Sequence, residues 1–266
     1  MLEIIKYIIL GIIQGITEIF PISSSGHLVI FSHLLGLNLE HLSIFLMITN
    51  TGSFLALVIF FRQDLKQLLV GTYRFVIKRE QNFKQDFEYV LKLLVAIIPL
   101  GIAAFFFKNH LPDDLLTIGF ALIITAGLLF YIYKIRDIQW KKELSWKNAL
   151  VIGAFQMFAF VPGISRSGMA LSGGLSQKIE LKKIVKFSFL AYIFISIPVM
   201  IVGFYNAYHA SESIHIVGYS LAFMMSFIFS FFTIHVLYHF IKVKNLLYFS
   251  LYCLLIGGLS IVLYFL

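Results

Sequence analysis

Charge and cysteine are both scarce in this chain of 266 residues. Only 13% of the residues are charged, compared with about 25% in an average soluble protein. Hydrophobic residues make up 60% of the chain, far more than a soluble core of this length requires. The single cysteine, Cys253, lies inside an apolar run, so a disulfide and a metal site built from several thiolates are excluded.

The hydrophobic residues are gathered in runs long enough to cross a membrane. A hydrocarbon layer of about 30 Å is spanned by roughly 20 apolar residues in a helix. We therefore expect an all-α, polytopic membrane protein with one membrane domain over residues 1–266. Six runs predict transmembrane helices, at 42–61, 90–107, 115–133, 184–205, 216–238 and 246–265.

Two other apolar stretches, 4–36 and 148–175, are interrupted near their middle. The first contains the sequence PISSSG at 21–26, and the second contains PGISRSG at 162–168. A break at membrane depth is tolerated only where protein or a water-filled cavity satisfies the backbone groups. We expect each stretch to form a re-entrant helix–loop–helix hairpin that lines a site. The alternative is a pair of ordinary spans kinked at proline.

The two interrupted stretches also match each other at a fixed offset of 142 positions. Identical glycine, glutamine and serine residues are informative in so apolar a chain, and they indicate an internal repeat, about 1–133 and about 147–266. Three predicted spans separate the hairpins, so the repeat is expected to be inverted, with its site near the midplane where the loops meet. The matched pairs are Gly11 and Gly153, Gln14 and Gln156, Ile22 and Ile164, Ser23 and Ser165, Ser25 and Ser167, and Gly26 and Gly168.

Positive charge is concentrated in four segments, 62–88, 134–147, 176–186 and 239–245, which hold 17 of the 21 lysines and arginines. All four fall on one side of the expected topology, which the positive-inside rule assigns to the cytoplasm. This orientation accounts for the net charge of +8, and no nucleic acid partner is expected. Residues 63–88 carry no recognisable motif and are expected to form a solvated loop.

The polar residues of the two hairpins are the candidates for function, because polar groups are costly inside a membrane. Gln14 and Glu18 are four residues apart and share one helix face. Arg166 is expected to face Glu18 and to clamp a phosphate group, since its fork of donors matches phosphate oxygens. The alternative is a purely structural ion pair between Arg166 and Glu18. Candidate anion-binding residues beside Arg166 are Ser165, Ser167 and Gly168.

The serine run at 23–25 lies directly before His27. A hydroxyl within reach of a histidine is the arrangement of an activated nucleophile, and Glu18 would orient the imidazole or position a metal or water. The serines also suit the N-terminal cap of a helix that starts near His27, and one of the three is expected to have that role.

These motifs resemble those of one known family. The sequence QGITE at 14–18, followed by PISSSGH at 21–27, is similar to the (E/Q)xxxE and PxSSxGH motifs of the undecaprenyl-diphosphate phosphatases that are linked to bacitracin resistance. The sequence PGISRSG at 162–168 resembles that family's PGxSRSG motif. The resemblance covers essentially the whole chain.

The resemblance implies hydrolysis of the terminal phosphate of undecaprenyl diphosphate, which recycles the lipid carrier of cell-wall precursors. It implies a bacterial cell membrane location, a site open to the outer face, and a divalent cation, commonly magnesium. Glu18 is the expected metal ligand, shared with the diphosphate, because the chain offers too few carboxylates for a dedicated cage. The family's functional positions fall on Gln14, Glu18, Ser24, His27 and Arg166.

The mechanism expected from these residues is metal-assisted phosphoryl transfer, with Ser24 as nucleophile and His27 as its proton acceptor. Arg166 is the diphosphate clamp, and Glu18 is the orienting or metal-binding carboxylate. A water nucleophile activated by His27 or Glu18 is the alternative. The substrate-binding residues would be Gln14, Ser23, Ser25, Ser165, Ser167 and Gly168.

A different class of function stays open, a polyprenyl-phosphate transporter or flippase, because inverted repeats are common in transporters. The sequence also leaves the oligomeric state open, a homodimer included. Four residues depart from the family's common pattern and bear on metal affinity and turnover: Gln14, Leu46, Ala170 and Lys186.

Overall fold

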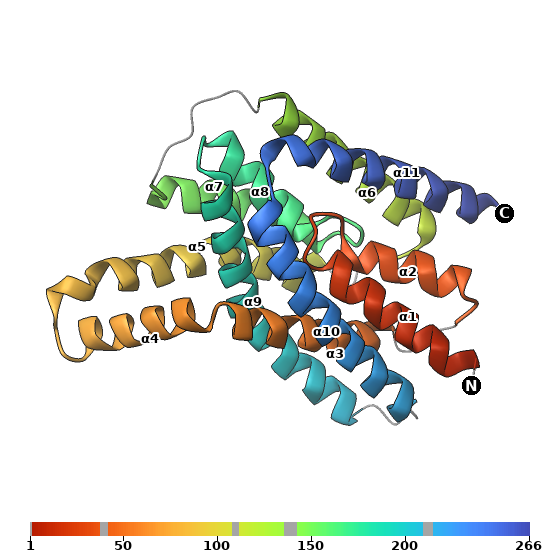
Figure 1. Cartoon of the computed structure of the whole chain (residues 1–266), viewed down its shortest axis with the longest axis horizontal. Helices are drawn as coiled ribbons and strands as arrows, with labels where there is room; N and C mark the ends of the chain where they lie inside the picture. The colour runs from red at the N-terminus through yellow and green to blue at the C-terminus, as the bar shows by residue number, and fades with distance from the viewer. Residues whose placement is uncertain (1, 38–41, 108–111, 136–142, 210–214) are drawn as a thin grey trace.

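The computed structural model describes residues 2–37, 42–107, 112–135, 143–209 and 215–266, and their regular elements are helices (Figure 1). The expected all-α class is therefore confirmed. The α-helices are α1 (Leu2–Thr17), α2 (Ser24–Leu34), α3 (Leu42–Phe60), α4 (Arg62–Val76), α5 (Lys84–Phe107), α6 (Leu115–Lys134), α7 (Trp146–Met157), α8 (Arg166–Ser176), α9 (Leu181–His209), α10 (Ile216–Phe240) and α11 (Leu246–Phe265). Short 3-10 helices are η1 (Gln81–Phe83), η3 (Phe158–Phe160) and η4 (Val243–Asn245).

Six of these helices, among the residues that the structure describes, are long and apolar enough to cross a membrane. They are α3, α5, α6, α9, α10 and α11, the same six that the hydrophobic runs predict. The largest difference is at α5, which begins at Lys84 rather than near residue 90. The protein is thus a multi-pass membrane protein.

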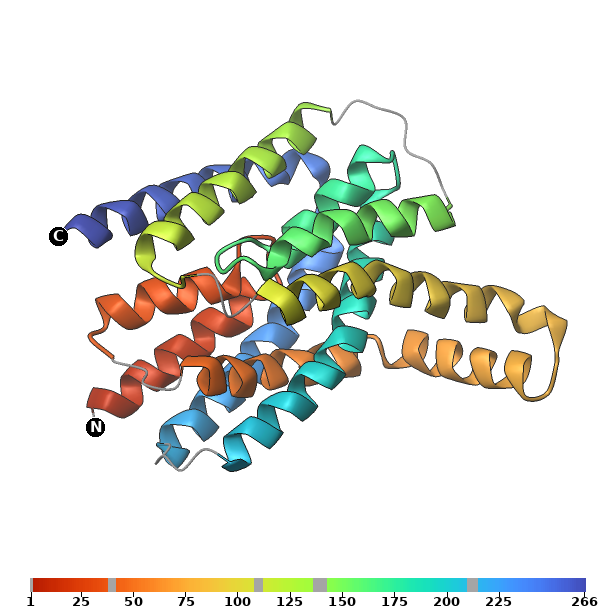
Figure 2. The same ribbon diagram turned by 180° about the vertical axis from the view of Figure 1, so that it is seen from behind.

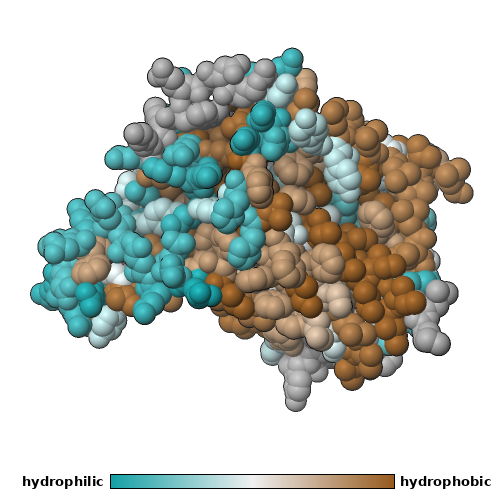
Figure 3. Space-filling view, viewed as in Figure 1, coloured by the Kyte–Doolittle hydropathy of each residue, from teal (hydrophilic) through white to brown (hydrophobic). Residues whose placement is uncertain are grey.

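Residues 63–88 are not the solvated loop that was expected. They form α4, the η1 turn and the start of α5, which project together from the bundle as an arm (Figure 1, left). Contacts that hold the arm together include a hydrogen bond from Gln67 to Asp86 at 2.9 Å and stacking of the Phe75 and Phe87 rings at 5.0 Å. The arm is mostly hydrophilic, whereas the surface over much of the bundle is hydrophobic (Figure 3). The predicted loop was therefore wrong, because the prediction rested on polar composition alone.

Close helix packing on one side of the bundle depends on glycine. A Cβ atom on Gly15 of α1 would lie 2.7 Å from the carbonyl oxygen of Ser226 in α10, and one on Gly52 of α3 would lie 2.6 Å from that of Phe223. The Ser230 hydroxyl donates to the carbonyl of Gly15 at 3.0 Å. Small residues and interhelical hydrogen bonds of this kind join helices in lipid. On the other side, α6 and α11 lie side by side (Figures 1 and 2).

Both interrupted stretches have the expected helix–break–helix form. The breaks lie between α1 and α2, and between α7 and α8, and they meet near the centre of the molecule (Figure 2). A Cβ atom on Gly26 would lie 3.3 Å from the Cα of Gly163, and one on Gly168 would lie 3.3 Å from the carbonyl oxygen of Pro21. Gly163 has a φ of +91°, which favours glycine. The predicted meeting of the two loops is confirmed.

Candidate active site

The two loops end in the same capping hydrogen bond. Ser23 caps α2, where its side chain accepts a hydrogen bond from the Gly26 amide at 3.4 Å. Ser165 caps α8 in the same way, accepting from the Gly168 amide at 3.1 Å. Ser23 and Gly26 are the residues that match Ser165 and Gly168 at the offset of 142 positions. Ser23 is thus the N-cap among the three serines, and its hydroxyl and that of Ser165 are occupied by the helix ends.

A buried carboxylate, Glu18, lies where the loops meet. Its Oε1 forms an ion pair with the guanidinium of Arg166 from the other loop. Its Oε2 accepts hydrogen bonds from the Ser24 hydroxyl at 2.5 Å and from the Gln14 amide at 3.1 Å. The structure therefore brings together four of the residues that the sequence selected. Arg166 has five N–H donors and is half-buried, so its contact with Glu18 leaves donors for an anion.

Arg166 is also held by a residue that the sequence did not suggest. Its Cζ lies 3.9 Å from the centre of the Tyr192 ring, in a cation–π contact. The Tyr192 hydroxyl donates to the backbone carbonyl of Asn50 at 3.2 Å, and the Asn50 side-chain oxygen accepts from Gln14 at 2.6 Å. Tyr192 and Asn50 were missed because each lies within a long apolar run, where the sequence gives no pattern that separates them from packing residues.

His27 is fully buried and makes both of its ring hydrogen bonds away from Ser24. Its Nδ1 lies 2.7 Å from the carbonyl oxygen of Ser23, and its Nε2 lies 3.0 Å from the hydroxyl of Tyr252 in α11. The expected contact between Ser24 and His27 is replaced by the hydrogen bond from Ser24 to Glu18.

Ser165 and Ser167 hold the second loop in place, and Ser25 and Gln156 lie in other settings. The Ser165 amide donates to the Thr125 hydroxyl at 3.2 Å, and the Ser167 hydroxyl donates to the carbonyl of Phe20 at 3.4 Å, across the two loops. Ser25 lies half-buried in the first turn of α2. Gln156, the repeat counterpart of Gln14, donates instead to the carbonyl of Ala96 in α5 at 3.4 Å. The two copies have thus diverged around their loops.

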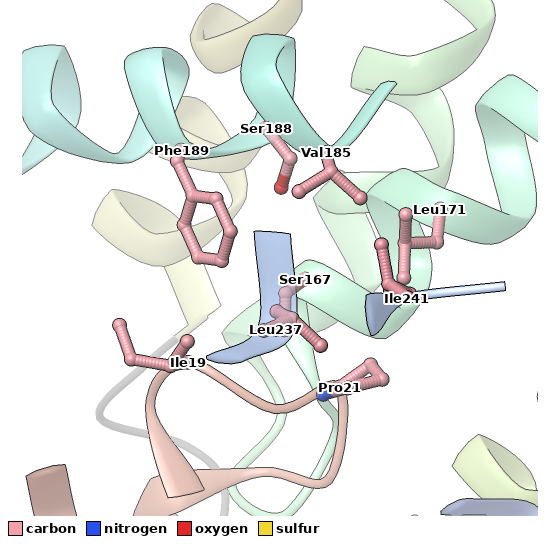
Figure 4. A pocket seen from close by; sticks show the side chains of 9 residues that line it. All are labelled: Ile19, Pro21, Ser167, Leu171, Val185, Ser188, Phe189, Leu237 and Ile241. Atoms are coloured by element: carbon pink, nitrogen blue, oxygen red, sulfur yellow. The ribbon is translucent and has the colours of Figure 1, made fainter. Parts of the chain in front are cut away.

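A small, mostly apolar pocket lies beside the loops (Figure 4). Pro21 of the first loop and Ser167 of α8 face it together, with side chains of α9 on the opposite side. Ser167 is therefore accessible from a space next to Glu18 and Arg166, although neither of these lines the pocket. The lining residues are Ile19, Pro21, Ser167, Leu171, Val185, Ser188, Phe189, Leu237 and Ile241.

The oxygen donors of the site suit a hard cation that is shared with a ligand. Gln14 Oε1 is buried and has no hydrogen-bond partner, while the Nε2 of the same amide donates to Glu18 Oε2 and to Asn50 Oδ1. Oxygen atoms of this kind are the ligands that magnesium prefers. The described residues contain no group of three or more His, Cys, Asp or Glu side chains placed to hold a metal. The donor set therefore fits an ion completed by substrate oxygens and water, not a dedicated cage.

The other three departures from the family pattern have structural settings outside this cluster. Lys186 of α9 forms an ion pair with Asp64 of α4, so its positive charge has an acidic partner. Leu46 packs against an apolar cluster that includes Phe45, and Ala170 is fully buried. All three are accommodated by packing or pairing without contact to Glu18.

Six membrane-spanning helices, together with two capped loops that converge on Glu18, Ser24 and Arg166, define a polytopic membrane protein with a buried polar site. The family described as bacitracin resistance protein BacA matches residues 7–259, and the chain belongs to this family. The resemblance drawn from the motifs is thereby confirmed.

Relatives match along nearly their full length. The chain is 52% identical over 272 residues to the undecaprenyl-diphosphatase of Acholeplasma laidlawii, covering 99% of this chain and 98% of the relative. It is 36% identical over 265 residues to the undecaprenyl-diphosphatase of Oceanobacillus iheyensis, with 97% and 96% covered. It is 35% identical over 263 residues to undecaprenyl-diphosphatase 1 of Bacillus cereus strain ATCC 10987, with 97% of each covered.

Proposed function

We propose that this protein is a membrane hydrolase that removes the terminal phosphate of undecaprenyl diphosphate, giving undecaprenyl phosphate for reuse as the cell-wall lipid carrier. The observation that carries this proposal is the 52% identity, over 99% of the chain, to a protein named undecaprenyl-diphosphatase. The comparisons give no support to the alternative of a transporter or flippase. Since the relatives are bacterial, the proposed location is the bacterial cell membrane.

In the proposed reaction, Arg166 and the amide groups at the starts of α2 and α8 bind the diphosphate and offset its negative charge. The Ser24 oxygen attacks the terminal phosphorus, the anhydride bond breaks, and undecaprenyl phosphate leaves. Because Ser24 already donates its hydrogen bond to Glu18, that carboxylate takes the serine proton in place of His27. Glu18 then transfers this proton to the phosphate oxygen of the undecaprenyl phosphate that leaves.

The second step restores the enzyme. Water attacks the phosphorus of phosphoserine, and the bond between phosphorus and the Ser24 oxygen breaks. One hydrogen of the water stays on the released inorganic phosphate, and the other returns to Ser24. The whole sequence therefore consumes one water and leaves Glu18 and Ser24 unchanged.

A magnesium ion fits this proposal beside Glu18, Gln14 and Asn50, whose side-chain oxygens would hold it together with the diphosphate. When bound, the ion supplies positive charge next to the phosphate oxygens. Gln14 also donates a hydrogen bond to the Glu18 carboxylate, and Asn50 accepts a second one from the same Gln14 amide.

The proposed topology has two re-entrant hairpins, α1–α2 and α7–α8, in an inverted repeat with the site open to the outer face. It is supported by the three spans between the hairpins, the corresponding capping hydrogen bonds of Ser23 and Ser165, and the 17 basic residues gathered in four segments.

This topology predicts opposite labelling of cysteines at the two ends of α5. In a Cys253→Ser background, which removes the only native thiol, Gln81→Cys should be protected from an impermeant thiol reagent in intact cells, because it lies on the cytoplasmic arm. Asp113→Cys, which is exposed before α6, should be labelled. Gln81→Cys should react after the membrane is opened, which is the accessibility control. The reverse labelling pattern in intact cells would show that the protein has the opposite orientation to the one proposed.

The function itself is tested with purified protein in detergent and a polyprenyl diphosphate. Release of inorganic phosphate is expected, with one phosphate for each polyprenyl monophosphate formed. Protein reconstituted in liposomes provides the contrasting measurement. Movement of the lipid headgroup between leaflets without any phosphate release would contradict the hydrolase function and support the transporter function.

The contact between Arg166 and Tyr192 predicts a split between two substitutions of the tyrosine. Tyr192→Phe keeps the ring under the guanidinium and should stay within about threefold of the normal rate. Tyr192→Leu removes the ring and should lower kcat by at least about tenfold, because a desolvated cation–π contact is worth about 2 kcal/mol. Phosphate release is measured alongside the melting temperature of each variant. An equal loss in both variants would assign the effect to the hydroxyl and its bond to Asn50.

A further inference from the structure

The hydrogen bonds of His27 define its tautomer. A backbone carbonyl oxygen only accepts, so the Nδ1 atom that lies 2.7 Å from the Ser23 carbonyl must carry the proton. In the neutral imidazole the Nε2 atom then has the free electron pair and accepts. The Tyr252 hydroxyl, 3.0 Å from Nε2, is therefore the donor in that contact. The two rings lie nearly parallel, with an interplanar angle of 8° and centroids 5.4 Å apart.

The position of Tyr252 in its helix is unusual for a tyrosine. Tyrosines of membrane helices favour the two interfaces, where the hydroxyl meets water. Tyr248 and Tyr264 lie near the two ends of α11 and fit that pattern. Tyr252 lies six residues into the helix, about 9 Å from its start at 1.5 Å per residue. Its ring is 37% exposed on the bundle surface, yet its hydroxyl turns inward to His27.

Helix α11 reaches the first hairpin through aromatic side chains. Phe249 contacts Phe20 at a centroid distance of 5.1 Å, and one turn later Tyr252 contacts His27. Helix α11 is also held by this contact and by hydrogen bonds from Ser250 and Ser260 to carbonyl groups of α6, none of which involves Tyr252. The hydroxyl of Tyr252 can therefore be removed without removing the packing that holds α11 against the hairpin.

We propose that Tyr252 is a positioning residue for the phosphatase reaction, which acts by holding His27 in the tautomer with the proton on Nδ1 and the electron pair on Nε2. The proposal rests on the proposed function. With Nδ1 bound to the cap residue of α2, this tautomer keeps the one basic nitrogen of His27 directed away from the hydrogen bond between Ser24 and Glu18. Loss of the Tyr252 hydroxyl would leave Nε2 without its donor, and only the bond from Nδ1 to the Ser23 carbonyl would then hold the tautomer and orientation of the ring.

The kinetic test uses Tyr252→Phe, with Tyr248→Phe as the matched control on the same helix. Tyr248 is 70% exposed, and its substitution removes the same atom from the same residue type one turn away. Tyr252→Phe should lower kcat for phosphate release by about fivefold to tenfold, with KM changed by less than about twofold, as expected when the loss of one hydrogen bond disturbs a side chain next to the reacting groups. Tyr248→Phe should match the unaltered protein. A normal kcat in Tyr252→Phe, or an equal loss in Tyr248→Phe, would overturn the proposal.

A double-mutant comparison tests whether Tyr252 acts through His27. In a His27→Ala background, Tyr252→Phe should cause no further loss, because the group that it positions is already absent. The same fivefold to tenfold loss in that background would overturn the proposal, since Tyr252 would then act on another part of the site.

A measurement that needs no activity separates this proposal from the proposed function. Nitrogen NMR of the eight histidines, labelled with 15N, reports the state of each ring nitrogen, and the His27 signals are identified by their absence in His27→Ala. Tyr252→Phe should move the Nε2 signal of His27, and Tyr248→Phe should not. An unmoved Nε2 signal would overturn the positioning role even if phosphate release is normal. A moved signal in a protein that releases no phosphate would refute the proposed function alone.

Discussion

Arg166→Lys is expected to reduce phosphate release almost as severely as Arg166→Ala, by at least about a hundredfold. A lysine ammonium is a point charge and cannot reproduce the planar fork that binds two phosphate oxygens at once. The structure adds a second reason, because the guanidinium also lies over the Tyr192 ring while it pairs with Glu18. An ammonium group in this place cannot make all of these contacts together.

Comparison of the lysine and alanine variants separates catalysis from stability. Arg166→Ala leaves the buried Glu18 without its partner, and breaking a buried ion pair in this way costs about 3–5 kcal/mol. Arg166→Lys retains the positive charge and should stay closer to the stability of the unaltered protein. Low activity in a lysine variant that melts near the normal temperature would assign the loss to phosphate binding. Near-normal turnover in that variant would show that Arg166 serves only as the structural ion-pair partner of Glu18.

The sequence was sufficient to predict the residues that meet at the site, because these residues are exceptions to their surroundings. Glu18 and Arg166 are charged in apolar stretches, and the repeat offset relates the two loops that carry them. The contact between them follows once the loops are brought together. The six spans were predictable for a related reason, since length and hydrophobicity alone determine whether a helix can cross a bilayer.

The sequence was not sufficient to predict the aromatic residues that hold the site. Tyr192 and Tyr252 lie in spans rich in phenylalanine, tyrosine and leucine, so neither stands out by type or spacing. Their role depends on which helix faces which loop, a matter of tertiary packing. The partner of Ser24 was mispredicted for the same kind of reason. Proximity in sequence favoured His27, whereas the fold brings Glu18 to 2.5 Å and directs both His27 nitrogens elsewhere.

Ser24→Ala is expected to lower the maximal rate by at least about a hundredfold, with little change in substrate binding, because it removes the proposed covalent step. Ser25→Ala is the matched control, since the two hydroxyls are neighbours in the first turn of α2 and only Ser24 donates to Glu18. The control variant should cost much less. Both are measured as phosphate release over a range of substrate concentrations, so that kcat and KM are obtained separately.

The repeat gives the physical reason for expecting this difference. Ser23 and Ser165 cap equivalent helices, and the residue that follows each cap is Ser24 in one copy and Arg166 in the other. Both contact the same carboxylate, Glu18. The two copies therefore diverge at a helix position that faces the shared site, as expected if one loop attacks the phosphate that the other holds. If Ser24→Ala retains more than about a tenth of the rate, the nucleophile is water and the covalent intermediate is removed from the mechanism.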